Sequence, residues 1–220
     1  LEGITIQVLI NLLELSVDGA LKRMLIRAKS MQNDALLAQE EANIELAKEV
    51  INSDDEVDRF SFYIMRQLKI AIQNEHMLNE MGIGSPYHCL GYRLIVKNIE
   101  RVGDHATEIA KDLLEYKKPI KKSVLEPIHE MNAFTLSVLD EACLSLFMKD
   151  SNRAEKTVRK STEISKYEKK VQESMKTLRD AEEIYRVRRM SENIRRISEY
   201  SSDIAEIVLD VTIENTLRKQ

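Results

Sequence analysis

The chain has 220 residues, of which 43% are hydrophobic and 32% are charged, and its formal net charge is −4 at pH 7. This length and apolar content suffice for one or two globular domains. The acidic balance argues against a general nucleic-acid binder but leaves a local basic patch open. Only six glycines and three prolines are present. Because sheets and loops need such turn residues, the composition predicts an all-α fold.

Apolar residues that recur at steps of three and four predict the helices of the first half. A long apolar stripe places the first helix at about 4–40, followed by a polar break near Ala42. Residues 46–51 are expected to form a short helix. The polar residues 52–54 offer capping side chains, which predict a separate helix at about 54–80.

The clearest loop in the sequence is 81–86, which contains two glycines and a proline. Pro86 suits the first turn of the next helix, predicted at 86–116. The basic segment 117–122 contains another proline and is the main linker candidate. The helices expected beyond it are 123–149, 153–178 and 180–217.

The second half of the sequence resembles the first. The segment from Glu100 to Ala106 aligns with the segment from Glu199 to Ala205, 99 residues later. Three amphipathic helices per half are the smallest set that encloses a core. We therefore expect two repeated three-helix bundles side by side. The expected boundaries are 1–116 for the first bundle, 117–122 for the linker and 123–220 for the second bundle.

Acidic residues are paired one helical turn apart at matching places in this repeat. Like charges at this spacing repel by a few tenths of a kcal/mol, so a nearby cation would relieve the repulsion. The third pair falls on the helix expected to lie beside the first pair. The three pairs are Glu100 with Asp104, Glu199 with Asp203, and Asp54 with Asp58.

Two interpretations of these pairs remain open. Carboxylates that converge from neighbouring helices hold metal ions in helical bundles, and oxygen-only ligands favour hard ions such as Mg²⁺, Ca²⁺, Mn²⁺ or iron. Alternatively, the acids form solvated faces with salt bridges. Examples of such bridges are Lys97 with Glu100 and Arg196 with Glu199.

Other candidate features also have two interpretations. His105 either joins a metal site through its imidazole or is a packed or surface residue. Gly103 either permits the close approach of a neighbour or an ion, or is incidental to packing. A run of arginines near the C-terminus either meets phosphate or an acidic partner, or pairs with nearby acids, which we favour. The run comprises Arg186, Arg188, Arg189, Arg195 and Arg196.

Catalytic motifs are not recognisable. The sequence contains no glycine-rich phosphate loop, no HExxH motif and no nucleophile–base arrangement. A carboxylate-bundle metalloenzyme would need Glu-x-x-His pairs at the expected places, and these are absent. We therefore do not expect an enzyme. Two isolated cysteines and the lack of a signal peptide or a long apolar run predict a cytoplasmic protein.

The sequence at 92–110, YRLIVKNIERVGDHATEIA, resembles the signature of the PhoU family of phosphate-uptake regulators. The segment 54–59, DDEVDR, resembles the family's acidic motif on the preceding helix. The resemblance covers essentially the whole chain, since the family has two repeated, spectrin-repeat-like three-helix bundles. It implies a regulator rather than an enzyme, one that restrains phosphate import through a phosphate ABC transporter and its sensor histidine kinase.

The resemblance also implies metal ions, because the family's E/D-x-x-x-D motifs bind clusters of iron or of other ions such as Mg, Mn, Zn or Ca. Carried over by residue, one site comprises Asp54, Asp58, Glu100 and Asp104, and a second is anchored by Glu199 and Asp203. The sequence departs from the pattern at the second site, where Ser161 and Ser165, which align with Asp54 and Asp58 at a shift of 107 residues, replace that acidic pair. That site would need other ligands, such as Glu206 or Glu168.

The expected partners follow from the same resemblance. They are the transporter components and the kinase, with a second copy of the chain in a homodimer, no direct nucleic acid, and membrane contact only through the transporter. The alternative is a PhoU-type sensing or dimerisation domain of a larger transcription regulator or ion transporter. That alternative stays open because the chain begins at Leu1 rather than Met.

Overall fold

A computed structural model describes residues 15–73 and 75–217. Within these residues the regular structure is entirely helical, which confirms the predicted all-α class. The helices are α1 (Val17–Glu41), α2 (Ile44–Ala71), α3 (Glu75–Glu80), α4 (Pro86–Tyr116), α5 (Lys122–Met148), α6 (Ser151–Ser161), α7 (Ile164–Met175) and α8 (Ala181–Leu217).

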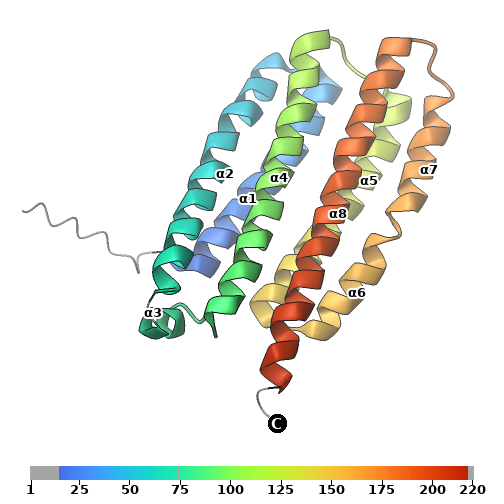
Figure 1. Ribbon diagram of the computed structural model, residues 1–220. Helices are drawn as coiled ribbons and strands as arrows, with labels where there is room; N and C mark the ends of the chain where they lie inside the picture. The colour runs from blue at the N-terminus through green and yellow to red at the C-terminus, as the bar shows by residue number, and fades with distance from the viewer. Residues whose placement is uncertain (1–14, 74, 218–220) are drawn as a thin grey trace, which may run out of the picture.

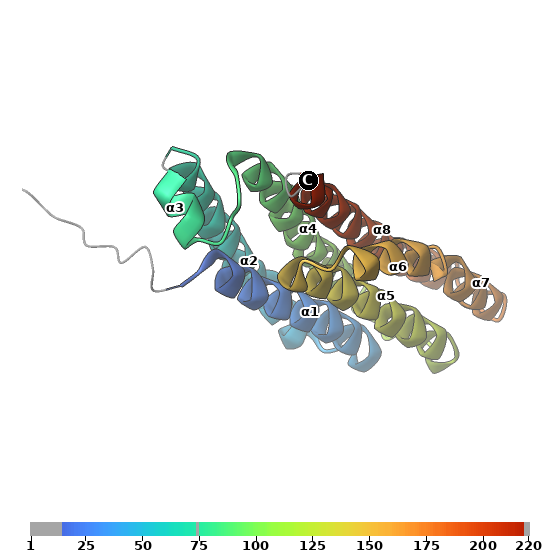
Figure 2. The same cartoon turned by 90° about the horizontal axis from the view of Figure 1, so that it is seen from below.

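The helices form two bundles that lie side by side (Figure 1). In the first bundle α1, α2 and α4 all pack against one another, and the short α3 contacts α2. In the second bundle α5 and α8 pack together, and α6 followed by α7 supplies the third member. Figure 2 shows that α4 and α8 lie next to each other at the junction, where the two helices are in extensive contact. The prediction of two repeated three-helix bundles is confirmed.

The first half differs from the prediction at 52–54. The separate helices expected at 46–51 and 54–80 are wrong, because α2 runs without a break from Ile44 to Ala71. Its N-cap is Asn43, whose side chain accepts a hydrogen bond from the backbone N–H of Leu46. Ser53 Oγ donates to the backbone carbonyl of Glu49 at 2.8 Å, so its hydroxyl is satisfied within the helix.

The other boundaries of the first half follow the sequence more closely. α4 begins at Pro86, as predicted, after the N-cap Ser85. α1 begins at Val17, and the part of the expected first helix over 4–14 lies outside the described residues. The basic segment after α4 is irregular and begins with Lys117 in the left-handed conformation, at a φ of 53°.

The helix expected at 153–178 is interrupted after Ser161. Three hydroxyl-bearing side chains around this point bond to local backbone carbonyls: Ser161 to Val158, Thr162 to Arg159, and Ser165 to Thr162. Such bonds compete with the helical ladder. The third member of the second bundle is therefore two shorter helices, α6 and α7.

Among the described helices, only α5 is long and apolar enough to cross a membrane, and 56% of its most apolar window is buried within the protein. Its buried side chains include Ile128, Met131 and Leu139, which are fully enclosed in the core. The apolarity of α5 is thus explained by its packing against α8, α6 and α7.

The junction between the bundles is close at Gly91 of α4. A Cβ atom there would lie 2.8 Å from Val211 Cγ1 and 3.2 Å from Ile207 Cγ2 of α8. We expect Gly91→Leu to lower the free energy of unfolding by about 2 kcal/mol, because it overpacks this contact. Urea denaturation measures the change. Leu90→Ala, at a neighbouring side chain that is 52% exposed, should change stability by less than about 0.5 kcal/mol; equal effects of the two variants would contradict the close packing.

Candidate metal centre

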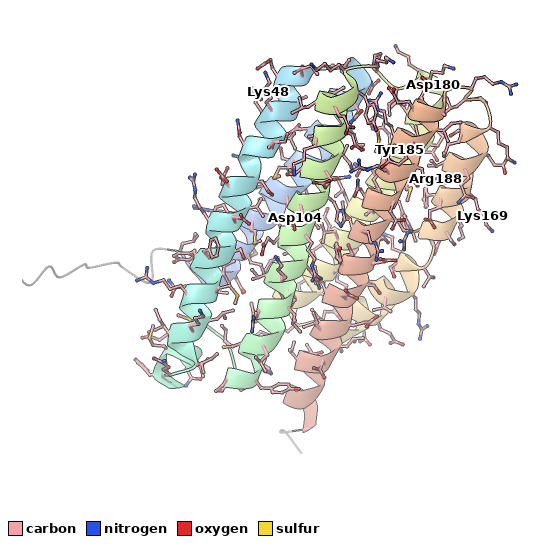
Figure 3. All side chains as sticks on the ribbon, turned by 45° about the horizontal axis from the view of Figure 1, so that its top comes forward. Lys48, Asp104, Lys169, Asp180, Tyr185 and Arg188 are labelled. Atoms are coloured by element: carbon pink, nitrogen blue, oxygen red, sulfur yellow. The ribbon has the colours of Figure 1, made fainter. Side chains whose placement is uncertain are left out.

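Two of the predicted acidic pairs lie on neighbouring helices, α2 and α4. Ser61 Oγ of α2 donates to Glu100 Oε2 of α4 at 3.1 Å, which places these parts of the two helices beside each other. A Cβ atom on Gly103 would lie 3.2 Å from Asp54 Oδ1, so the glycine leaves room for this carboxylate against α4. Asp104 lies about halfway along α4 (Figure 3). We call Asp54, Asp58, Glu100 and Asp104 the first-half carboxylates.

The first-half carboxylates repel one another. Burial, followed by the charges of Asp104 and Asp58, raises the pKa of Asp54 from 3.8 to about 6. Burial and then the charge of Glu100 raise the pKa of both Asp58 and Asp104. Ionisation of each of these three aspartates therefore costs more free energy than ionisation of a free aspartate. A cation bound among the four carboxylates would lower that cost.

Lys97 makes a short ion pair with this group. Lys97 Nζ lies 2.6 Å from Glu100 Oε1, which is the salt bridge expected in the solvated interpretation. Lys97 also lowers the pKa of Asp58 and Asp104, but it is a smaller influence than burial and the neighbouring acids. The salt bridge and the acidic cluster thus coexist, and the lysine leaves the first-half carboxylates with excess negative charge.

The donor chemistry of the group suits a hard cation. All four side chains offer carboxylate oxygens, the ligands preferred by Mg²⁺, Ca²⁺ and Mn²⁺. In the part of the chain that the structure describes, however, no three His, Cys, Asp or Glu side chains stand close enough to hold one ion. The residues therefore fit a metal ion in type, charge and helix position, and side-chain rotation would be needed to close a coordination shell.

His105, the residue after Asp104, is directed to the second bundle. Its Nδ1 lies 2.8 Å from Asn193 Oδ1 and its Nε2 lies 3.1 Å from the Tyr200 hydroxyl, both on α8. The imidazole also stacks on the Tyr200 ring, with 5.5 Å between centroids. Of the two interpretations of His105, the packed residue is confirmed, and its function in the fold is to join α4 to α8.

The second-half residues are arranged differently. Glu199 is paired with Arg195 and with Arg196, the latter at 3.1 Å, as the solvated interpretation expected. Asp203 is largely exposed, but partial desolvation of its carboxyl, followed by the charges of Glu206 and Glu199, raises its pKa. Where the first half has carboxylates on α2, the second half has the end of α6 and the turn before α7. The structure therefore does not place a second acidic pair opposite Glu199 and Asp203.

The arginine run pairs mostly with acids of the same chain. Arg189 contacts Asp112 at 2.8 Å and Glu108 at 3.3 Å, both on α4. Arg186 is 2% exposed and forms a buried network that the sequence pattern did not indicate. Its burial depends on residues distant in sequence, so no local signal marks it.

The model of the PhoU domain matches the chain twice, over residues 21–113 and 128–208. The chain belongs to the PhoU family. The two PhoU segments correspond to the two bundles, and the candidate centre lies within the first segment.

Similar proteins are consistent with this membership. The PhoU homologue of Aquifex aeolicus, named a phosphate-specific transport system accessory protein, is 29% identical over 145 residues, which are 63% of each chain. The match thus spans less than two thirds of that relative. PhoU from Pseudomonas aeruginosa has a TM-score of 0.75 at 17% identity, with 90% of this chain and 96% of that chain covered. The phosphate transport regulatory protein PhoU from Streptococcus pneumoniae has a TM-score of 0.70 at 18% identity, with 88% and 91% covered.

Proposed function

We propose that this chain is a cytoplasmic, metal-binding regulator of phosphate uptake. It acts through protein–protein contacts with a phosphate ABC transporter, its sensor kinase, or both, and it works as a homodimer rather than as an enzyme. The observation that carries the metal part is the packing of Asp54 against Gly103, which brings acids of α2 and α4 together. Membership of a family of phosphate-transport regulators supports the regulatory part.

The proposed ion is held by the first-half carboxylates: Asp54, Asp58, Glu100 and Asp104. A bound cation, whether iron or one of Mg, Mn, Zn and Ca, would offset the mutual repulsion that, after burial, raises the aspartate pKa values. Because α2 and α4 supply two ligands each, binding would strengthen the contact between these helices. An ion that binds only the folded state also raises the free energy of unfolding by mass action.

The test compares Asp58→Ala with Asp104→Ala, as a double variant, with the unmodified protein. We expect elemental analysis after loading with Mn²⁺ or Fe²⁺ to find metal in the unmodified protein and little in the double variant. Asp55→Ala with Glu115→Ala is the matched control, because it removes two exposed acids from the same two helices. This control should retain metal. A metal-free unmodified protein, or equal binding by the double variant, would refute the assignment.

The regulatory part has a separate readout. In cells without their own copy, the unmodified chain should restore restraint of phosphate uptake, and the double variant should restore less. Restraint by both proteins at equal expression would separate regulation from the metal site. Light scattering measures whether the purified chain is the proposed homodimer.

A further inference from the structure

Arg195 of α8 lies among three carboxylates in the second bundle. Its Nη2 is 2.5 Å from Glu192 Oε1, its Nη1 is paired with Glu199, and its Nε is 3.6 Å from Glu168 Oε1 on α7. Only 24% of its side chain is exposed. Arg195 therefore holds a guanidinium at a point where side chains from two helices present negative charge.

The internal repeat shows how the position of Arg195 differs from the matching position in the first half. At the shift of 99 residues, Glu199 corresponds to Glu100 and Arg196 corresponds to Lys97, and each pair forms the same ion pair one turn apart. Arg195 corresponds to Val96, which is 1% exposed in the core of the first bundle. Arg195 is therefore the additional cation of the second half.

The charge balance of the two halves differs accordingly. The first half sets four carboxylates against the ammonium of Lys97, whereas the second sets Glu168, Glu192 and Glu199 against the guanidinium groups of Arg195 and Arg196. Charge-assisted bonds of this kind satisfy the carboxylate oxygens directly. Asp203, the counterpart of Asp104, takes no part in these ion pairs. With Asp203 included, two paired cations face four carboxylates in the second half, whereas one paired cation faces four in the first, so the negative excess is smaller in the second half.

At the positions that match Asp54 and Asp58 the second bundle offers no carboxylates, and Glu168, the candidate replacement ligand on α7, lies 3.6 Å from Arg195 Nε. Ser161 and Ser165 stand at the positions of Asp54 and Asp58, and both hydroxyls donate to backbone carbonyls of their own segment. They also flank the break between α6 and α7. The residues of the second half therefore do not fit the second metal site that the family resemblance implied.

We propose that Arg195 is a resident cation of the second bundle, occupying among its carboxylates the place that an external metal ion takes in the first. Metal binding in the first bundle rests on the proposed function, whereas the position of Arg195 among the second-half carboxylates does not. It follows that the ion pair between Arg195 and Glu168 joins α8 to α7 whether or not metal is present. Only the site between α2 and α4 would then bind metal and respond to its concentration.

The test uses Mn²⁺ as the probe and the double variant with Asp58→Ala and Asp104→Ala as the background. With Arg195 intact, adding Glu199→Gln to this background should leave Mn²⁺ binding unchanged. Adding Arg195→Val, which installs the residue found at the matching place in the first half, should raise Mn²⁺ affinity by about tenfold or more. Adding Glu199→Gln should abolish that gain. Arg196→Val is the matched control and should give no gain, because Arg195 stays in place.

Two results with these variants would overturn the proposal. The first is that the double-variant background binds Mn²⁺ with Arg195 present and loses that binding on Glu199→Gln. The second is that Arg195→Val does not raise the Mn²⁺ affinity. Hydrogen exchange of the unmodified protein gives a measurement that needs no variant. Mn²⁺ should slow exchange in α2 and α4 and leave α7 unchanged, and slowing in α7 would also overturn the proposal. Unchanged α2 and α4 would count against the proposed first site and not against Arg195.

Discussion

Arg186→Met should lower the free energy of unfolding by about 3 kcal/mol, because it leaves the buried Gln39 amide oxygen and the partly buried Lys118 carbonyl without their donor. Arg186 Nη2 donates to Gln39 Oε1 at 2.7 Å and to the backbone carbonyl of Lys118 at 2.8 Å. Its guanidinium also lies over the Tyr116 ring, 5.3 Å from the centroid. The side chain thus joins α1, α8 and the segment that connects the bundles. Methionine replaces the aliphatic part of the side chain but lacks the guanidinium, so it cannot donate to either acceptor.

Urea denaturation of Arg186→Met and Arg188→Met measures this effect. Arg188 lies two residues further along α8 and is exposed (Figure 3), so the same substitution there should change stability by less than about 0.5 kcal/mol. Similar losses in the two variants would show that the burial of Arg186 contributes little. A stabilised Arg186→Met would show that removing a buried charge outweighs the lost hydrogen bonds.

The arrangement of helices was predictable because its signals are local. The 3.6-residue period marks each buried face, and the start of α4 follows from Pro86 with a serine before it. The failures also have local causes. The polar residues 52–54 were expected to begin a helix, but inside α2 Ser53 bonds to a carbonyl one turn earlier, which is an equally local use of the same hydroxyl. Packing against α1 and α4 decides between the two.

The candidate site was only partly predictable for a different reason. The repeat placed the acids of α2 near those of α4, and the structure brings them together around Gly103. Which cations surround each acidic group depends on contacts between helices far apart in sequence. The pairing of Arg195 with Glu168 on α7, and that of Arg189 with Asp112 on α4, have no local signature. The two halves differ in charge balance because residues at matching places in the repeat differ, as Val96 and Arg195 do.

Asp54→Asn should act in opposite directions on stability and on metal binding. In the metal-free protein the Asp54 pKa is raised from 3.8 to about 6, chiefly by burial and then by Asp104 and Asp58. The folded state therefore binds the proton more tightly than the unfolded state. As pH rises through this interval the unfolded chain loses its proton first, so the carboxyl lowers the free energy of unfolding, and the full loss is present above about pH 6.

Asparagine keeps the size of the side chain and removes the charge. At pH 7.5 in EDTA we expect Asp54→Asn to raise the free energy of unfolding by about 1 kcal/mol, a value reduced for solvent screening of this partly exposed group. At pH 3 the gain should disappear, because the aspartate is then protonated in both states. Asp55→Asn, at the exposed neighbouring residue, is the control and should change stability little at either pH.

The same substitution should weaken Mn²⁺ binding by about tenfold or more, since it replaces one of four proposed carboxylate ligands with a neutral amide oxygen. Residues that lower the free energy of unfolding when the site is empty, and that bind the ion when it is present, are expected where selection acts on ligand binding rather than on folding. Calorimetric titration with Mn²⁺ and denaturation in EDTA give the two readouts on the same protein samples. A variant that is less stable at pH 7.5 would show that Asp54 holds α2 to α4 by itself. A variant that is more stable but binds Mn²⁺ normally would confirm the repulsion and remove Asp54 from the ligand set.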